Sequence, residues 1–256
     1  MVRLDVGAGV ARLVLDRRAD ANALDLDSAR DALGALRTAE SDPSVLVLAI
    51  TGAGDFFCGG GDVKGMAAAD DPSAFLTELA DAVHEFVFAL VTSRLFVVAA
   101  VNGPAAGGGL GLVLAADYVI ASERARFLGA YAAIGLTPDS GVSYLLARAV
   151  GHRRAMELLL TGRRLSAPDA LQWGLLNESV TPEDFDSRVS ALCESIAAGV
   201  PEVLAETKKL MGQEHLEEYR AHLAQESATI ARMAAHPQSA ALIRRFASRN
   251  SGASPA

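Results

Sequence analysis

The sequence has little of what marks a secreted, membrane-bound or nucleic-acid-binding protein. Its two cysteines, Cys58 and Cys193, are too few for a disulfide framework and predict two reduced thiols. There is no signal-peptide hydrophobic region, and no apolar run reaches membrane-spanning length without a charge or a glycine cluster. The net charge is −8, with no stripe of lysine or arginine for nucleic acid. We therefore expect a soluble, cytoplasmic protein with no membrane and no nucleic-acid partner.

Nucleotide-binding signatures are also missing. The chain has no GxxxxGK[ST] motif, and no strand-borne GxGxxG followed by an acidic residue at the right distance. What it does have is 256 residues that are 51% hydrophobic, enough for one substantial core and a small accessory part. No metal site is expected.

Two glycine-rich stretches dominate the sequence. Val97–Asp117 predicts a buried strand that enters a small-residue helix through Gly107–Gly109, which leaves free N–H groups at the positive end of the helix dipole. Thr51–Met66 repeats this design with Gly59–Gly61. Two such donors can converge on one carbonyl oxygen and stabilise an oxyanion, although tight turns packed on a neighbouring backbone are the structural alternative.

Four motifs in unbroken order resemble the enoyl-CoA hydratase/isomerase family, the crotonase superfamily: CGGGDV, AAVNGPAAGGGLGL, IGLTPDSG and LLTGRRLSAPDALQWGLLNESV. The resemblance extends from about Arg12 to Val180. It implies an α/β fold, the crotonase-like ββα spiral, with a C-terminal helical subdomain. It also implies an acyl-CoA thioester substrate, no separate cofactor because CoA is part of the substrate, and a homotrimer or hexamer.

The order of the expected elements agrees with such a spiral. Alternating residues within Val2–Leu15 predict a hairpin, and Leu26–Glu40 and Pro72–Ser93 have helical periodicity. A strand, a glycine loop and a helix follow each other twice, and sheet signals end near residue 182. We therefore expect a spiral core over residues 1–181 and a helical part over residues 182–256 for capping and oligomerisation.

The resemblance assigns the catalytic residues. The oxyanion donors are the backbone N–H groups of Gly61 and Gly108. Asp139 falls where family isomerases carry an acid/base carboxylate and where the 4-chlorobenzoyl-CoA dehalogenases carry a nucleophile. Burial beside an apolar acyl pocket should raise the pKa of such a carboxylate and make it a proton shuttle near neutral pH. From position alone, Asp139 or Ser140 is more simply explained as the N-cap of the next helix.

The family's hydratases carry two glutamates, and this chain has Gly111 and Tyr131 at those positions. Addition of water by the usual route therefore lacks its carboxylates, and we expect an isomerase. The alternatives are a hydratase that uses an unusual residue such as Tyr131, a dehalogenase-like enzyme with Asp139 as nucleophile, and a non-catalytic acyl-CoA binder.

Further residues are expected to contact the substrate. His84 matches a functional histidine of the dehalogenases, although a lone histidine is more often a surface or satisfied residue. Arg244 and Arg245 could meet CoA phosphates or form a solvated face. The expected acyl pocket also includes Phe75, Leu79 and Phe86. The complete set of expected binding residues is Ala23, Gly59, Asp62, Val63, Met66, His84, Gly107, Tyr131 and Ile134.

Overall fold

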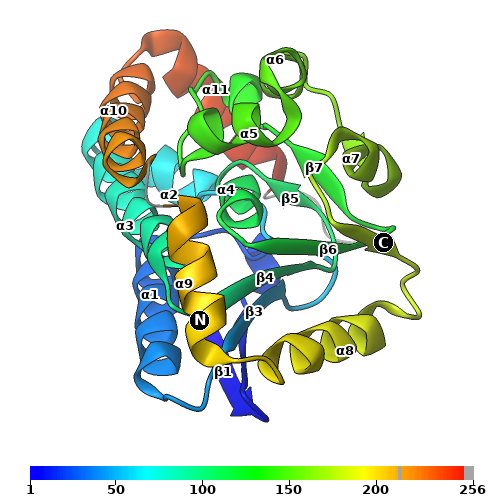
Figure 1. The fold of residues 1–256 in the computed structure, drawn as a ribbon. Coiled ribbons are helices and arrows are strands. Elements are labelled where there is room, and N and C mark those ends of the chain that lie inside the picture. The colour runs from blue at the N-terminus through cyan, green and yellow to red at the C-terminus, as the bar shows by residue number, and fades with distance from the viewer. Residues whose placement is uncertain (213–214, 251–256) are drawn as a thin grey trace.

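A six-stranded sheet forms the centre of the computed structural model, which describes residues 1–212 and 215–250 (Figure 1). The strands lie in the order β1-β2-β3-β4-β6-β9, with β1 and β2 antiparallel and the others parallel. They are β1 Val2–Gly7, β2 Val10–Leu15, β3 Val47–Gly52, β4 Phe96–Val101, β6 Tyr118–Ser122 and β9 Glu178–Val180.

A second, small sheet lies beside the first. It joins β5 (Ala105–Ala106), β7 (Arg126–Leu128) and β8 (Leu165–Ser166), in that order. Strand β5 belongs to the second glycine stretch and also forms an isolated bridge with Cys58 of the first. The small sheet therefore holds the two glycine stretches side by side.

Helices cover both faces of the large sheet. Helix α3 packs against α1 and α10, and α8 contacts β3, β4 and β6 from the other side. The helices are α1 Leu26–Ser41, α2 Val63–Ala68, α3 Pro72–Thr92, α4 Gly108–Leu114, α5 Val142–Val150, α6 His152–Leu160, α7 Ala167–Trp173, α8 Phe185–Ala197, α9 Pro201–Gly212, α10 Leu216–Ala234 and α11 Pro237–Asn250, with short 3₁₀ turns at Arg18–Asp20 and Ala132–Ile134. None of those described is long and apolar enough to cross a membrane.

The sequence pattern explains the central elements. Strands β3 and β4 are nearly continuous apolar runs because a central parallel strand is buried on both faces. Helix α3 buries an apolar stripe that includes Leu76, Leu79 and Val83. Asp71 caps its start by accepting hydrogen bonds from Ser73 N and Ala74 N. The hairpin and the predicted helices are confirmed to within one or two residues at each end.

The C-terminal part is helical, as predicted, because the last strand ends at Val180 and α8 to α11 follow. Helices α8 and α10 each contribute side chains to one of the two buried apolar clusters. Phe185 and Val189 of α8 belong to one buried cluster, and Tyr219 and Leu223 of α10 belong to the other. The division of the chain near residue 181 into two subdomains stays a prediction.

Candidate active site

Backbone hydrogen bonds join the two glycine stretches. Ala106 N donates to Cys58 O at 3.0 Å, and Leu24 N donates to Gly60 O at 2.7 Å. The N–H of Asp62 in turn donates to Leu24 O at 2.9 Å. The loop before α2 and the turn before α4 therefore form one continuous surface.

Gly61 and Gly108 lie next to each other on this surface. A Cβ built on Gly108 would lie 4.0 Å from Gly61 N. Gly108 is the first residue of α4, where a helix leaves its N–H groups without an intrahelical carbonyl. Within the described chain, neither of these N–H groups donates a hydrogen bond to a carbonyl oxygen in a turn, loop or cap. The two N–H groups are thus available to one ligand oxygen.

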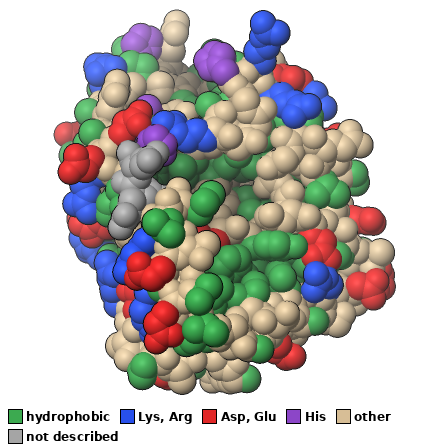
Figure 2. Space-filling view, in the orientation of Figure 1, with side chains coloured by type: hydrophobic (Ala, Val, Ile, Leu, Met, Phe, Trp, Pro, Cys, Tyr) green, Lys and Arg blue, Asp and Glu red, His purple; other side chains and the backbone are tan. Residues whose placement is uncertain are grey.

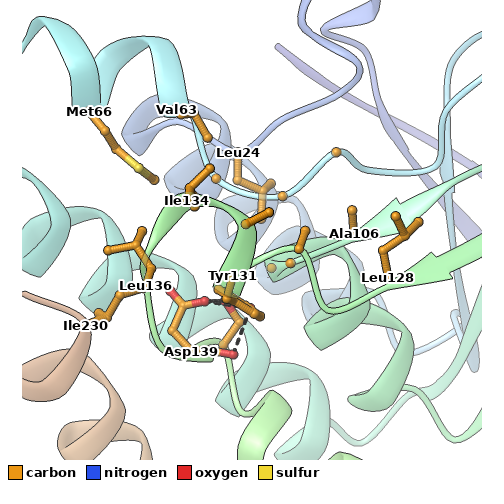
Figure 3. A pocket seen from close by; sticks show the side chains of 18 of the residues that line it. Leu24, Val63, Met66, Ala106, Leu128, Tyr131, Ile134, Leu136, Asp139 and Ile230 are labelled. Atoms are coloured by element: carbon orange, nitrogen blue, oxygen red, sulfur yellow. Dashed lines mark hydrogen bonds between the residues drawn. The ribbon is translucent and has the colours of Figure 1, made fainter. Parts of the chain in front are cut away.

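A cavity of about 370 Å³ opens beside these glycines (Figure 3). Its polar lining includes Asp139, Ser140 and Tyr131, and Asp139 is the single carboxylate among the described residues that line it. Most of the wall is aliphatic and comes from the segment before α1, from α2, α3 and α10, and from the loop before α5. These side chains are Leu24, Val63, Met66, Leu76, Leu79, Val83, Ile134, Leu136 and Ile230.

An outer groove of about 640 Å³ adjoins the cavity and shares Gly59, Gly61 and Val63 with it. Its lining includes three cationic side chains, Lys64, Arg126 and Arg164. Asp20 and Asp62 also line this groove, so the site combines a mainly apolar inner end with an entrance that carries charges of both signs.

Asp139 is held at one of its two oxygens. Tyr131 Oη donates to Oδ1 at 2.8 Å, and Ser140 Oγ donates to the same oxygen at 3.0 Å. Oδ2 accepts no hydrogen bond from the described residues. Burial and the charge of Asp139 raise the pKa of Tyr131, so its hydroxyl stays protonated and acts as a donor. Asp139, which is only 9% exposed, thus keeps one oxygen free in an apolar cavity.

The capping explanation for Asp139 and Ser140 is wrong. Helix α5 begins after Gly141, whose φ of +77° is left-handed, and no side chain of the N-cap residue caps the helix. The carboxylate that meets its first N–H groups is Glu226 of α10, whose Oε2 accepts from Gly141 N at 2.7 Å. Sequence reasoning missed Glu226, although its spacing from Leu223 and Ile230 places it on the buried stripe of α10.

His84 lies behind the cavity wall. Its Nε2 accepts a hydrogen bond from Ser140 N at 3.0 Å, and its side chain is buried. Burial lowers the pKa of His84, so the ring is neutral near pH 7. It is not among the residues that line the cavity. The structure therefore places it where it can hold the Asp139 segment from the rear.

Gly111 and Tyr131 fall at the two positions where the resemblance places the glutamates of hydratases. Gly111 also leaves no room for a carboxylate. A Cβ built on Gly111 would lie 2.5 Å from Ser140 O, so α4 and the loop before α5 approach too closely for a side chain. Tyr131 occupies the other position and directs its hydroxyl at Asp139 (Figure 3).

The other expected binding residues line one of the two hollows. Gly107, Met66 and Ile134 line the cavity, and Ala23 and Asp62 line the outer groove. Gly59 and Val63 line both.

Four further residues that were expected near the substrate line neither hollow. Phe86 is buried in the core, and Phe75 packs against Gly65. Arg244 and Arg245 are exposed on α11 and line neither hollow, whereas Phe246 lines both. Within the described chain, no group of three or more His, Cys, Asp or Glu side chains could hold a metal ion.

Comparison with known proteins identifies the fold as the crotonase fold. The structure matches the crystal structure of an enoyl-CoA hydratase from Bacillus halodurans with a TM-score of 0.89 and 27% identity, covering 95% of this chain and 99% of that one. The family model described as Enoyl-CoA hydratase/isomerase matches residues 5–251. The chain belongs to the enoyl-CoA hydratase/isomerase family.

Curated relatives carry different activities in their names. The chain is 38% identical to 4-chlorobenzoyl coenzyme A dehalogenase-2 from Arthrobacter, over 74% of this chain and 70% of the relative. It is 36% identical to 1,2-epoxyphenylacetyl-CoA isomerase from Escherichia coli, over 75% of this chain and 74% of the relative. Similarity of this degree gives the family, and the reaction has to be argued from the site.

Proposed function

We propose that the protein is an acyl-CoA isomerase that shifts a double bond from the 3-position to the 2-position of an enoyl thioester. The observation that carries this proposal is the lining of the cavity, in which Asp139 is the single carboxylate among the described residues. A 1,3-shift of a proton needs one group that first accepts and then donates it, whereas the addition of water in this family uses two carboxylates.

The first role in this mechanism is to hold the thioester oxygen. The N–H groups of Gly61 and Gly108 are close together and available, and would stabilise the negative charge as the α-carbon loses its proton. Removal of one such donor typically costs about 10² to 10³ in rate. Because both donors are backbone groups, the loops themselves are the catalytic device.

The second role belongs to Asp139. Its free Oδ2 takes the α-proton, which leaves a dienolate on the oxyanion site, and the same carboxyl then returns the proton to the γ-carbon. The product is the conjugated 2-enoyl thioester, with the same atoms as the substrate. Tyr131 and Ser140 bond Oδ1 throughout and leave Oδ2 to carry the proton.

The test follows both candidate reactions on the purified protein. With a 3-enoyl-CoA we expect the conjugated thioester absorbance to rise while the product mass stays unchanged. With a 2-enoyl-CoA we expect no gain of water. Addition of water to the 2-enoyl-CoA would contradict the proposal, and silence on both substrates with tight binding of CoA esters would favour a non-catalytic binder.

A dehalogenase-like reaction is the second candidate, favoured by the 38% identity to an Arthrobacter dehalogenase. The free Oδ2 of Asp139 suits a nucleophile as well as a proton shuttle. Against it, His84 Nε2 already accepts from Ser140 N and does not face the cavity. Incubation with 4-chlorobenzoyl-CoA in heavy-oxygen water distinguishes the two, because only a nucleophilic Asp139 would carry the label into the protein.

A further inference from the structure

A glutamate from another part of the chain caps the helix that follows Asp139. Glu226 Oε2 accepts from Gly141 N at 2.7 Å, and its Oε1 accepts from Ser143 N at 3.0 Å and from the Ser143 hydroxyl. The first N–H groups of α5, which a helix leaves unpaired, are thus bonded by a side chain 85 residues further along. The capping is supplied across the structure, from α10.

No lysine or arginine of the described chain forms an ion pair with Glu226. It is 4% exposed, and the basic groups that come within 4.0 Å of it in the described chain are His84 and His222, each at 3.8 Å. Burial lowers the pKa of both histidines, so both are neutral near pH 7. The three hydrogen bonds from the start of α5 are therefore the contacts that hold this buried side chain, and burial raises its pKa to about 7.

The segment that Glu226 holds is conformationally demanding. Ser140 has a φ of +58°, which a residue with a side chain adopts only when its surroundings impose it, and Gly141 follows at +77°. A Cβ on Gly141 would meet Tyr219 Oη of α10. Two elements keep the segment in this form, α3 through His84 and α10 through Glu226.

This conformation decides where the Asp139 carboxylate lies. Ser140, the residue between Asp139 and the capped Gly141, bonds Asp139 Oδ1 through its hydroxyl and His84 through its N–H. Helix α10 reaches the same region a second time through Ile230, one turn after Glu226. Ile230 lines the cavity (Figure 3). The position of α10 is thereby coupled to the position of the carboxylate.

We propose that Glu226 is a positioning residue for Asp139, which fixes the segment Asp139–Gly141 by capping α5 from α10. The inference rests on the proposed function of Asp139 as the proton-transferring group. It assigns the C-terminal helices a part in catalysis, because one of them supplies the contact that orients the carboxylate.

The test compares Glu226→Gln with Glu217→Gln, an exposed glutamate on the same helix, in the full-length protein. The amide of the first variant keeps the shape of the side chain but turns an NH₂ group toward an N–H donor. We expect its kcat for a 3-enoyl-CoA to fall by about tenfold or more while KM changes by less than about threefold. Glu217→Gln should stay within about twofold of the wild type.

A double-variant cycle separates positioning from a general structural effect. In the Asp139→Asn background, Glu226→Gln should cost less than about twofold, because the group that it positions is gone. A folded Glu226→Gln protein with wild-type kcat overturns the inference, and so does an equal loss in both backgrounds. If Asp139→Asn itself turns over at the wild-type rate, it is the proposed function that fails.

Hydrogen exchange tests the inference without reference to the reaction. The amides of Gly141 and Ser143 should exchange at least about tenfold faster in Glu226→Gln than in Glu217→Gln. Unchanged exchange overturns the inference. Should Glu226→Gln not fold, Ser143→Ala removes one of the three bonds and should give a smaller loss of kcat with the same dependence on Asp139; no loss there also overturns it.

Discussion

Asp139 owes its place to residues that bond one of its oxygens and leave the other free. Tyr131 and Ser140 both donate to Oδ1, and the aliphatic wall of the cavity surrounds the side chain. The tyrosine stands where a hydratase would carry a glutamate. In this chain the side chain at that position donates a hydrogen bond to Asp139.

Tyr131→Phe tests this hydrogen bond. The variant keeps the ring and removes the hydroxyl bond to a charged group, a contact that contributes about 1.5–3 kcal/mol. We expect kcat to fall by about 10- to 100-fold with little change in KM, measured with a 3-enoyl-CoA. Tyr118→Phe, which removes a hydroxyl bonded to Glu178 on the large sheet, is the control and should leave the rate unchanged. An unaffected Tyr131→Phe enzyme would contradict the orienting role.

The site residues that could be predicted from sequence are those fixed by local pattern. The glycine stretches could be predicted in this way, because they stand between strands and helices whose periodicity is clear. The role of Asp139 comes from the resemblance to the family, since its position alone favours a helix cap. Glu226 and the bond between His84 and Ser140 could not be predicted, because they join segments 85 and 56 residues apart. The capping interpretation failed for the same reason, since the helix start was filled from a distance.

Among the elements, α9 is held against the sheet by a partly buried ion pair. Lys208 Nζ lies 2.7 Å from Asp117 Oδ2 and also donates to the carbonyl oxygens of Leu90 and Leu95. Asp117 Oδ2 in turn accepts from Val97 N. Burial raises the pKa of Asp117 and lowers that of Lys208, and the charge of each partner opposes this shift. Each group is therefore kept in its charged form by the other.

Lys208→Met should therefore destabilise the protein. It leaves Asp117 without its partner and two carbonyl groups without a donor, a loss of about 1–3 kcal/mol. Lys209→Met is the matched control, because Lys209 forms an exposed ion pair with Glu206, and its effect should be within about 0.5 kcal/mol. Urea unfolding measures both, and equal free energies of unfolding for the two variants would refute the anchoring role of Lys208.

The whole molecule presents apolar surface as well as an apolar site. On the face drawn in Figure 2, hydrophobic side chains gather over the sheet between α8 and α9. Val200 and Val203, at the start of α9, are 59% and 60% exposed. Surface of this kind often marks a contact with another protein chain. The expected homotrimer or hexamer stays a prediction, which light scattering of the purified protein would check.

Stability should depend on pH through Glu226. Burial raises its pKa to about 7 from an ordinary value of 4.5, so between these pH values the folded protein holds a proton that the unfolded chain has lost. The contribution of the protonated group is complete below about pH 4.5 and is lost as the pH rises to about 7. The free energy of unfolding of the wild type, relative to Glu226→Gln, should fall by up to about 3 kcal/mol over this range.

Denaturant unfolding of the two proteins across this pH range measures the difference. His84 and His222, which face Glu226, have lowered pKa values and act in the opposite direction, but both are present in each protein. Parallel pH profiles for the wild type and Glu226→Gln would show that Glu226 is ionised throughout and that burial does not raise its pKa.

A single substitution at Asp139 tests whether one carboxylate moves the proton. Wild type and Asp139→Asn are compared for the formation of 2-enoyl-CoA from 3-enoyl-CoA, with the affinity for the CoA ester measured in parallel. We predict a turnover lower by about 10² to 10⁴ in Asp139→Asn, with nearly unchanged affinity. An Asp139→Asn protein that isomerises at the wild-type rate would show that Asp139 does not transfer the proton.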